Sequence, residues 1–485
     1  MHLFDRAAPL KAWHSGLLGF LLVLPWLQPW SPAPLPNVVP LLVSWACMGL
    51  LMAVGLRIRP LDIAKAWAWA ALASSAIGLL QYFGQAAWLS PWAHVPDHLG
   101  EAMANLRQRN QLATLTSIGI LAVLWWDRHG LQRVHTGWML ALLTLGNAAT
   151  NSRTGLLQML LVTGLVMGWS FSGQSGQRRL SWRWALAALG MYAVAIWALP
   201  QLLSMGAGQD SVNALTRLSH DDGCGSRKVL WRNVLYLIGQ KPWWGWDWGE
   251  LKYAHYSATY PDARFCDILG NAHNGPLHLA FSFGLPLTVL LMVALLGLVT
   301  WLRPWRTHQL PHQLAWGVLA VIGLHSLLEF PLWYGPFQMA VLLCVWLLMP
   351  QPLGASDTVQ KIWRFMGLAI VAAVAFVAVD YARVRQIFIP PSQRWALGSD
   401  HPLMLAKRSV FFEQTAQFAE FTLTPVTPEN ATQMLRVGEA MLHYSPEPRV
   451  IRKVIAAATL VGDTQRAQWH TALLKAAFPQ EQVGP

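Results

Sequence analysis

The sequence predicts an all-α, polytopic membrane protein, and three observations support that fold class. Of the 485 residues, 54% are hydrophobic and only 12% are charged, whereas a typical soluble domain is about 25% charged. About 11 apolar stretches have roughly the length that crosses a bilayer as a helix. Short segments beside these stretches hold about half of the Lys and Arg residues, as the loops of membrane proteins do.

Each predicted span is an apolar run that ends at charged residues, Pro or Gly. The first run follows Arg6 and Lys11 as a signal peptide would, but no small-x-small cleavage site appears, so we expect a retained helix. The expected helices cover residues 14–29, 38–56, 66–84, 111–126, 136–150, 154–172, 183–204, 276–301, 314–329, 336–350 and 363–381.

The charges of the connecting loops predict the orientation. With the N-terminus in the cytoplasm, fourteen Lys and Arg residues lie in or beside cytoplasmic loops, and only Arg107, Arg109 and Arg153 lie in the four short loops on the other side. This is the positive-inside distribution. An odd number of spans then puts the C-terminal tail outside. We therefore expect a multi-pass membrane protein with its C-terminus outside the cytoplasm.

Tryptophan is abundant, and many of the 28 Trp residues lie near the ends of predicted spans. Aromatic rings favour the two membrane–water interfaces, so we expect these residues to form an interfacial belt. Examples are Trp26, Trp30, Trp125, Trp126, Trp301 and Trp305.

Two segments are long enough to form aqueous parts. The expected division is transmembrane helices 1–7 in residues 1–204, a large periplasmic loop in 205–275, transmembrane helices 8–11 in 276–384 and a periplasmic helical domain in 385–485. In this tail, apolar periodicity predicts helices at 431–443, 446–460 and 464–478, with a Gly-Asp turn at 462–463.

The net charge of +12 does not indicate nucleic-acid binding. The tail after Arg385 holds nine Lys and Arg residues against eight Asp and Glu residues, so it offers no polybasic surface. The remaining excess of positive charge is mostly explained by the loops beside the spans. We expect membrane lipid, and no nucleic acid, among the partners.

The four cysteines fall into two pairs. Cys47 and Cys344 lie inside predicted spans, where a small core residue is the simplest interpretation. Cys224 and Cys266 lie in the large loop. If that loop faces an oxidising periplasm, the two can form a disulfide, and closing about 43 residues stabilises the loop by roughly 4 kcal/mol in the chain-entropy model. The alternative is two free thiols.

Polar residues outside the aromatic belt gather on the external side of this topology. Ionisable groups at membrane depth are costly, so they usually face an aqueous cavity and mark function. The residues concerned are Arg107, Gln108, Arg109, Asn110, Asn151, Ser152, Arg153, Arg227, Lys228, Trp231, Arg232, Asn271, His273, Asn274, His325, Glu329, Trp333 and Tyr334.

Three separate external segments supply arginine, which predicts a polyanionic ligand such as a membrane-embedded diphosphate. Guanidinium groups pair bidentately with phosphate and keep their charge at physiological pH. The alternative is that each arginine reaches lipid headgroups or pairs with a local carboxylate. Arg153 opposes the positive-inside bias of its short loop, which favours the ligand role there.

His273 precedes an apolar helix and stands between Asn271 and Asn274. Histidine is the side chain whose ordinary pKa lies nearest neutral pH, so it suits proton transfer from an attacking hydroxyl; the alternative is a structural histidine. The sequence has no compact His/Cys ligand spacing, Gly-rich phosphate loop or Gly-x-Ser-x-Gly elbow. We therefore expect neither a metal site nor a cofactor.

The order of these patches resembles the O-antigen ligase superfamily, and most closely the bacterial protein O-oligosaccharyltransferases. The resemblance covers about half the chain, and no single motif is decisive. Departures occur at Gln111, where many relatives have histidine, and at Phe330, where many have tyrosine. The matching strings are Asn105 to Thr114 (NLRQRNQLAT), Asn151 to Leu156 (NSRTGL), Arg227 to Trp231 with Pro242 to Trp248 (PWWGWDW), Ala272 to Gly284 (AHNGPLHLAFSFG) and His325 to Tyr334 (HSLLEFPLWY).

The resemblance implies transfer of a glycan from undecaprenyl diphosphate to an acceptor hydroxyl at the periplasmic face of the bacterial inner membrane. Fixed arginines can neutralise the departing phosphate without a metal. The resemblance also implies that His273 is the essential histidine. Glu329 is a second candidate base, and its alternative role is an ion pair with a nearby arginine. The candidate substrate-binding residues are Arg153 and Arg227 for the diphosphate, with Gln108, Arg109, Tyr334 and Asn274 around the site.

The expected activity is O-linked protein glycosylation, in which the oligosaccharide moves en bloc to Ser or Thr of a periplasmic protein, whether pilin-like or general. The first and last matching strings and the helical tail favour protein as the acceptor. Attachment to the lipid A core, as by an O-antigen ligase, and polymerisation of O-antigen stay open. A transporter for lipid-linked glycan is less favoured, because transporters commonly show paired repeats and midplane polar groups.

Overall fold

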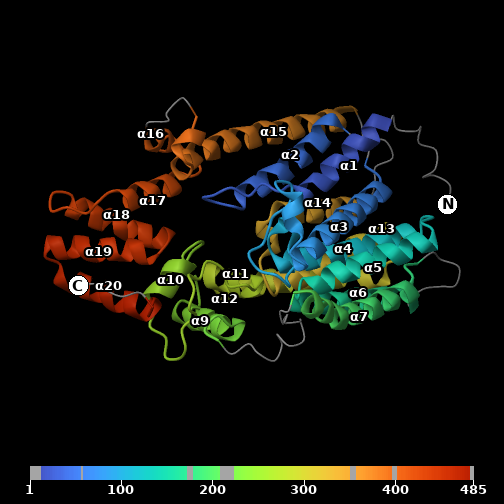
Figure 1. Cartoon of the computed structure of the whole chain (residues 1–485), viewed down its shortest axis with the longest axis horizontal. Helices are drawn as coiled ribbons and strands as arrows, with labels where there is room; N and C mark the ends of the chain where they lie inside the picture. Colours follow the sequence, from blue (N-terminus) through green and yellow to red (C-terminus); the bar gives the residue numbers. More distant parts are fainter. Residues whose placement is uncertain are drawn as a thin grey trace. The chain divides into compact units, whose positions relative to one another are not determined.

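The structure is a computed structural model that describes residues 12–55, 58–171, 179–207, 223–349, 357–395 and 401–480 (Figure 1). Within these ranges the regular structure is helical and includes no strand, so the predicted all-α class is confirmed. The chain forms two compact units. The first contains residues 1–220 and 299–375, and the second contains 221–298 and 376–485. The expected domain division at residues 204, 275 and 384 stays a prediction.

The first unit is a helix bundle around α4 (Arg109–Asp127), which is buried along almost its whole length. Helix α4 packs against α3, α5, α6 and α13. Small residues allow the close approach, since Gly119 of α4 leaves no room for a side chain beside Ala71 of α3. The other helices of this unit are α1 (Ala12–Leu27), α2 (Val38–Val54), α3 (Pro60–Tyr82), α5 (Arg133–Ala149), α6 (Arg153–Phe171), α7 (Trp182–Ala207), α13 (Leu310–Ser326) and α14 (Gly335–Leu348), with 3-10 turns η1 (Ala86–Leu89), η2 (Ala104–Leu106), η3 (Pro304–Arg306) and η4 (Pro331–Trp333).

Each predicted span is mostly helical where the structure describes it, and among the described residues five helices support membrane crossing most directly. Those five are long and apolar enough to cross a bilayer, whereas α1, α2 and α14 are apolar but shorter. The total of about 11 spans therefore stays a prediction. The five stretches are Pro60–Tyr82, Arg153–Phe171, Trp182–Met205, Leu285–Arg306 and Asp357–Phe388.

The prediction of one continuous helix at 276–301 is wrong. The segment forms two helices, α11 (Gly275–Phe283) and α12 (Leu285–Leu302), which meet at Gly284. Gly284 has φ +83°, a left-handed conformation that favours glycine. A side chain at Gly284 would also collide with the carbonyl group of Trp243. Hydropathy alone could not show this break, because both helices are apolar.

The interfacial belt stays a prediction, and two of the tryptophans named for it are buried instead of exposed. Trp30, Trp301 and Trp305 are exposed, but Trp26 and Trp125 are buried in the core of the bundle. The Trp26 ring lies edge-on to Phe337, with centroids 5.2 Å apart. A position near a span end therefore does not separate a lipid-facing ring from a core ring.

The second unit combines the large loop with the tail. In the tail, α18, α19 and α20 lie side by side (Figure 1, orange-red to red) and pack consecutively along the chain. Their positions match the three helices predicted there, and Gly462 ends α19 in the left-handed conformation. The helices of this unit other than α11 and α12 are α9 (Arg227–Gln240), α10 (Leu251–Ser257), α16 (Pro402–Ala406), α17 (Glu413–Leu423), α18 (Ala431–Tyr444), α19 (Pro448–Val461) and α20 (Thr464–Ala477), with 3-10 turns η5 (Gln386–Phe388) and η6 (Pro391–Gln393); α15 (Asp357–Arg385) leads into the unit.

A buried carboxylate fixes the start of the tail. Asp380 of α15 is inaccessible to solvent. Its Oδ2 accepts hydrogen bonds from Ser409 Oγ at 2.9 Å and from the backbone N–H groups of Val410 at 3.0 Å and Phe411 at 2.9 Å. Arg383 lies 3.5 Å from Oδ1. One side chain thus accepts from three donors, of which the Ser409 hydroxyl is buried and the two backbone N–H groups are partly buried.

We expect Asp380→Ala to lower the stability of the second unit by about 3 kcal/mol, because the buried Ser409 hydroxyl and two partly buried backbone N–H groups lose their acceptor. Thermal unfolding of the purified protein in detergent measures the change. Asp357→Ala is the matched control on the same helix, since the Asp357–Lys361 pair is exposed and its loss should cost under about 1 kcal/mol. Equal midpoints for the two variants would show that the carboxylate has no anchoring role.

Candidate functional site

Three arginines predicted for the site each occupy the first residue of a helix. Arg109 begins α4, Arg153 begins α6 and Arg227 begins α9. The N-terminus of a helix carries unpaired backbone N–H groups and the positive end of the helix dipole. A cation there is unfavourable by about 0.3–1 kcal/mol, whereas an anion is bound by both the N–H groups and the added charge. An arginine at the first residue of a helix therefore lowers the stability of the helix slightly and favours binding of an anion there.

Side-chain caps fix where α4, α9 and α11 begin. Gln108 Oε1 accepts from the Gln111 N–H at 2.7 Å at the start of α4, and Ser226 Oγ accepts from the Val229 N–H at 3.3 Å at the start of α9. Asn274 Oδ1 accepts from the Leu277 N–H at 2.9 Å at the start of α11. Gln108 and Asn274, both predicted to bind substrate, therefore also act as helix caps.

In the first unit, buried side chains join the beginnings of α4 and α6 to the end of α13. Ser152 Oγ donates to Asn110 Oδ1 at 2.6 Å, and Asn110 Nδ2 donates to Glu329 Oε1 at 3.0 Å. Ser152 precedes Arg153, and Asn110 follows Arg109. The structure therefore brings the helix starts of Arg109 and Arg153 together with the carboxylate of Glu329.

The same network continues into the bundle through residues that were not predicted as site residues. Thr114 Oγ1 donates to the Asn110 carbonyl at 2.8 Å and lies 2.9 Å from His325 Nδ1. Gln158 Nε2 donates to Thr114 Oγ1 at 2.8 Å. The available signal was the presence of polar residues inside apolar spans, with Thr114 one turn after Asn110. Hydropathy averages hide such residues, and only the packing shows that they meet.

Two further predicted residues of the first unit have identified surroundings. Arg109 forms an ion pair with Glu101 at 3.2 Å, as in the local-carboxylate alternative. Tyr334 caps the start of α14 with its backbone, and its ring stacks on that of Phe330 with centroids 5.9 Å apart. Burial raises the pKa of the Tyr334 phenol, so this group stays protonated and able to donate a hydrogen bond at neutral pH.

In the second unit, the backbone of His273 adopts a conformation that is uncommon for residues other than glycine. Its φ is +50°. Asn271 Oδ1 accepts from the His273 N–H at 2.9 Å, and Trp231 Nε1 donates to the Ala272 carbonyl at 3.1 Å. These bonds hold the loop of His273 against α9, the helix that begins at Arg227. Sparsely populated backbone conformations cluster at functional sites, where the surrounding structure maintains them.

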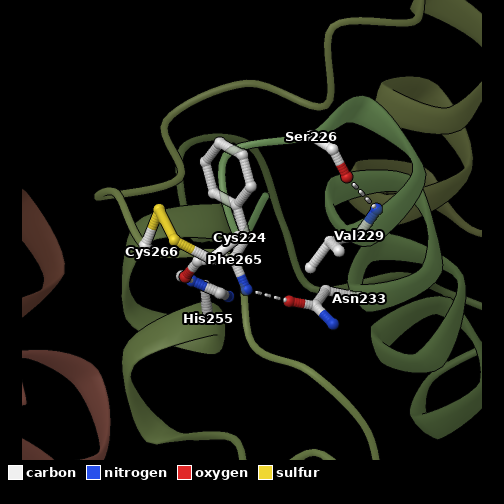
Figure 2. Close-up of a disulfide and its surroundings, with 7 residues drawn as sticks. All are labelled: Cys224, Ser226, Val229, Asn233, His255, Phe265 and Cys266. Carbon is white, nitrogen blue, oxygen red and sulfur yellow. Dashed lines mark hydrogen bonds between the residues drawn. A yellow bond between two sulfur atoms is a disulfide. The ribbon is translucent and has the colours of Figure 1, made fainter. Parts of the chain in front are cut away.

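A disulfide joins the two ends of the large loop (Figure 2). Cys224 and Cys266 are bonded, with their Cα atoms 5.4 Å apart, as the sequence allows for an oxidising environment. Beside the bond, Asn233 Oδ1 accepts from the Phe265 N–H at 2.8 Å. Cys224 lies just before α9 and Cys266 shortly before the loop of His273, so the disulfide limits how far these two parts can separate. Cys47 and Cys344 are free and buried.

His255 is buried in the same region (Figure 2) and remains neutral. Its Nδ1 lies 2.8 Å from Tyr260 Oη, and its Nε2 lies 3.1 Å from the Phe265 carbonyl. Burial, assisted by the charge of Arg264, lowers the pKa of His255 from 6.5 to about 3. Between pH 6.5 and about pH 3, His255 is therefore neutral in the folded protein and protonated in the unfolded chain.

This difference predicts that acidification from pH 6.5 toward pH 3 destabilises the second unit. His255 alone contributes a loss of about 5 kcal/mol, at about 1.4 kcal/mol for each unit of pKa difference. Thermal unfolding at pH 7.5, 6, 5 and 4 measures it, and His255→Gln, which keeps a donor and an acceptor but does not titrate, should flatten the dependence. Burial also lowers the pKa of His470 to about 4, so a smaller slope should remain. An unchanged slope in His255→Gln contradicts the prediction.

Metal independence is predicted from the sequence. In the part of the chain that the structure describes, no group of three His, Cys, Asp or Glu side chains could hold a metal ion. Independence from metal stays a prediction.

Three family descriptions match successive parts of the chain. "Protein glycosylation ligase" matches residues 102–126, "O-Antigen ligase" matches 138–292, and "Virulence factor membrane-bound polymerase, C-terminal" matches 313–483. The second match contains Arg153, Arg227 and His273. The resemblance predicted from the sequence, to the O-antigen ligase superfamily and its protein glycosylation ligases, is therefore confirmed.

Two similar proteins come from Acinetobacter baylyi (strain ATCC 33305 / BD413 / ADP1). The "General O-oligosaccharyltransferase" is 23% identical over 432 residues, which cover 83% of this chain and 71% of that protein. The "ComP-specific O-oligosaccharyltransferase" is 22% identical over 302 residues, which cover 60% of this chain and 53% of that protein. Both are named for the transfer of oligosaccharides.

Proposed function

We propose that this protein is a glycosyltransferase that moves an oligosaccharide en bloc from undecaprenyl diphosphate to Ser or Thr hydroxyls of periplasmic proteins. The observation that carries the proposal is the placement of arginine at the first residue of α4, α6 and α9, where helix dipole and guanidinium both favour an anion. The similarity to proteins named as O-oligosaccharyltransferases supports a glycan donor and a protein acceptor.

The proposed location is the bacterial inner membrane, with about 11 spans and with the site and the tail in the periplasm. The excess of fourteen Lys and Arg residues over three in the short loops supports this orientation. The Cys224–Cys266 disulfide supports it independently, because disulfides persist in oxidising compartments such as the periplasm.

The chemistry requires little beyond charge neutralisation and orientation. The acceptor oxygen forms a bond to the anomeric carbon, the bond from that carbon to the phosphate oxygen breaks, and undecaprenyl diphosphate leaves with the electron pair. Preorganised positive groups stabilise the charge that develops on the leaving phosphate. In this proposal Arg153 and Arg227 supply that charge without a metal or cofactor.

The hydroxyl proton needs an acceptor, because an aliphatic hydroxyl is too weak an acid to ionise at neutral pH. Transfer of the proton is concerted with attack, and His273 is the proposed base. Its fixed backbone conformation supports a positioned imidazole. Glu329 is the second candidate, supported by its burial and its bond to Asn110. Arg109, Gln108, Asn274 and Tyr334 complete the proposed substrate-binding set.

A glycoproteomic comparison of wild-type and deletion strains tests the acceptor. Glycosylated Ser or Thr peptides that disappear on deletion support protein transfer. The match to the "O-Antigen ligase" description favours attachment to the lipid A core as the second candidate, which a changed lipopolysaccharide ladder alone would indicate. The match to the polymerase description favours chain polymerisation, which would change only the glycan length distribution. A transporter would yield no covalent product from purified protein, donor and acceptor.

Gln108 offers a way to separate helix capping from substrate binding. We expect Gln108→Ser to lower the transfer rate about tenfold, the effect of losing one hydrogen bond of about 1.4 kcal/mol. Serine keeps a good N-cap at the start of α4, so the helix should remain intact. Transfer to acceptor protein in membrane vesicles measures the rate. A wild-type rate in Gln108→Ser would assign Gln108 to capping alone.

A further inference from the structure

One loop of the second unit contains four tryptophans that face in two directions. In this tryptophan loop, residues 241–249, Trp246 donates from Nε1 to the Leu237 carbonyl at 2.8 Å and stacks on Phe281. Trp248 stacks on Phe283 with centroids 5.8 Å apart. Trp243 and Trp244, in contrast, are 71% and 88% exposed. Trp246 and Trp248 therefore attach the loop to its unit, although Trp248 is also 55% exposed, and Trp243 and Trp244 are the most exposed rings of the loop.

Backbone hydrogen bonds attach the loop to the break between α11 and α12. The Trp246 N–H donates to the Phe281 carbonyl at 2.8 Å, and the Leu285 N–H donates to the Pro242 carbonyl at 2.8 Å. Gly245 and Gly284 both have positive φ, and neither leaves room for a side chain where the two backbones meet. The position of Trp243 and Trp244 is thus set by the start of α12.

Helix α12 has the properties of a lipid-facing span. It is apolar throughout, and only 6% of its most hydrophobic window is buried. Its 18 residues rise about 27 Å, close to the hydrocarbon thickness of a bilayer of about 30 Å. At its far end Trp301 is 75% exposed. Exposed tryptophans therefore occur at both ends of one bilayer-length helix.

Tryptophan rings at the two ends of a span favour the lipid headgroup layers, where the ring is apolar and its N–H remains hydrated. We propose that the tryptophan loop is inserted in the headgroup layer of the external leaflet, with Trp243 and Trp244 as its anchors, although the sequence places it in an aqueous loop. Lys241, held 4.1 Å above the ring of Trp246, adds a positive charge suited to lipid phosphates. The partner is the phospholipid surface.

The inference has a structural consequence for α11. Helix α11 separates the capping Asn274 from the break at Gly284, ten residues further on, by about 15 Å at 1.5 Å for each residue. An anchored loop would therefore keep the His273 segment within about that distance of the headgroup layer. The choice of leaflet rests on the proposed orientation, but the inference does not depend on the proposed activity, since it concerns only lipid contact.

Nitroxide labels can measure the depth of the loop. Because 28 tryptophans obscure intrinsic fluorescence, we suggest single cysteines at Trp244 or Trp243 in a Cys47→Ala, Cys344→Ala background that keeps the disulfide. The labelled protein is placed in phospholipid nanodiscs. The relaxation of each nitroxide is compared in dissolved oxygen and in a water-soluble nickel chelate. Trp469→Cys on α20, another exposed tryptophan, is the matched control.

We expect labels at positions 243 and 244 to collide at least about threefold more with oxygen, relative to the chelate, than the label at 469, because oxygen partitions into lipid. Adding Gly284→Val, which pushes the loop from the helix break, should shift the label at 244 toward the aqueous pattern. Labels at both 243 and 244 that match the one at 469 would overturn the inference.

Discussion

His273→Asn should reduce glycan transfer at least about 100-fold while the protein still folds and inserts in the membrane. General-base catalysis by a positioned side chain contributes about 10²–10⁴-fold, so its loss should be large. Asparagine is the informative replacement, because among residues other than glycine it best tolerates the positive φ found at this position. The variant thus removes the imidazole with little change in backbone strain. The rate is measured with purified protein, lipid-linked donor and acceptor protein.

The same assay should show a comparable loss for Arg227→Ala. Removing one group that stabilises developing charge typically costs about 10²–10³-fold in rate. Arg232→Ala is the matched control on the same helix, since Arg232 is exposed and lies 3.7 Å from the exposed Asp262. We expect its rate to stay near that of the wild type.

Specific outcomes would defeat this site assignment. Normal product levels from both His273→Ala and Arg227→Ala would exclude the proposed roles. Loss in Arg232→Ala as large as in Arg227→Ala would indicate that α9 as a whole, and not its first residue, matters. If His273→Asn is active and His273→Ala is inactive, residue 273 supports the backbone conformation and does not act as the base.

The second large effect is expected from the double variant Cys224→Ser, Cys266→Ser. Opening a loop closed over 42 residues costs roughly 4 kcal/mol in the chain-entropy model. The bond also limits the separation between the start of α9 and the segment before His273. We therefore expect a lower unfolding midpoint and at least about tenfold slower transfer, because misplacement of reacting groups by about 1 Å can cost about 10²-fold.

Reduction provides the control for the disulfide. Dithiothreitol should lower the unfolding midpoint of the wild type toward that of the double variant and should leave the double variant unchanged. Cys47→Ala with Cys344→Ala removes the two free buried thiols and keeps the bond. If the double serine variant unfolds at the wild-type midpoint in detergent, the bond does not stabilise the loop.

Much of the fold could be predicted from the sequence because spans depend on local composition. The beginnings of α4 and α6 lie within two residues of prediction, since Arg109 and Arg153 interrupt apolar runs. The break at Gly284 was not predicted, because it depends on contact with the backbone of Trp243, which lies in a distant segment. The burial of Trp26 escaped for the same reason, since Phe337 lies far along the chain.

The candidate site divides in a similar way. The chemistry of arginine and histidine is local and could be recognised from residue type and topology. The roles of Asn110, Thr114 and Gln158 could not, because each depends on hydrogen bonds between helices far apart in sequence. Nor could the sequence show that Gln108 and Asn274 cap helices, which requires the extended backbone found at both positions.

The sequence by itself determined the helical membrane class and the residues that suit an anionic, lipid-linked donor, because hydropathy and side-chain charge belong to each residue wherever it lies. Only the tertiary structure decided that Glu329 shares a hydrogen-bond network with the starts of α4 and α6, that His273 is held at positive φ, and that Trp243 and Trp244 project outward. Those features depend on distance between residues remote in the chain, and close packing, not composition, sets that distance.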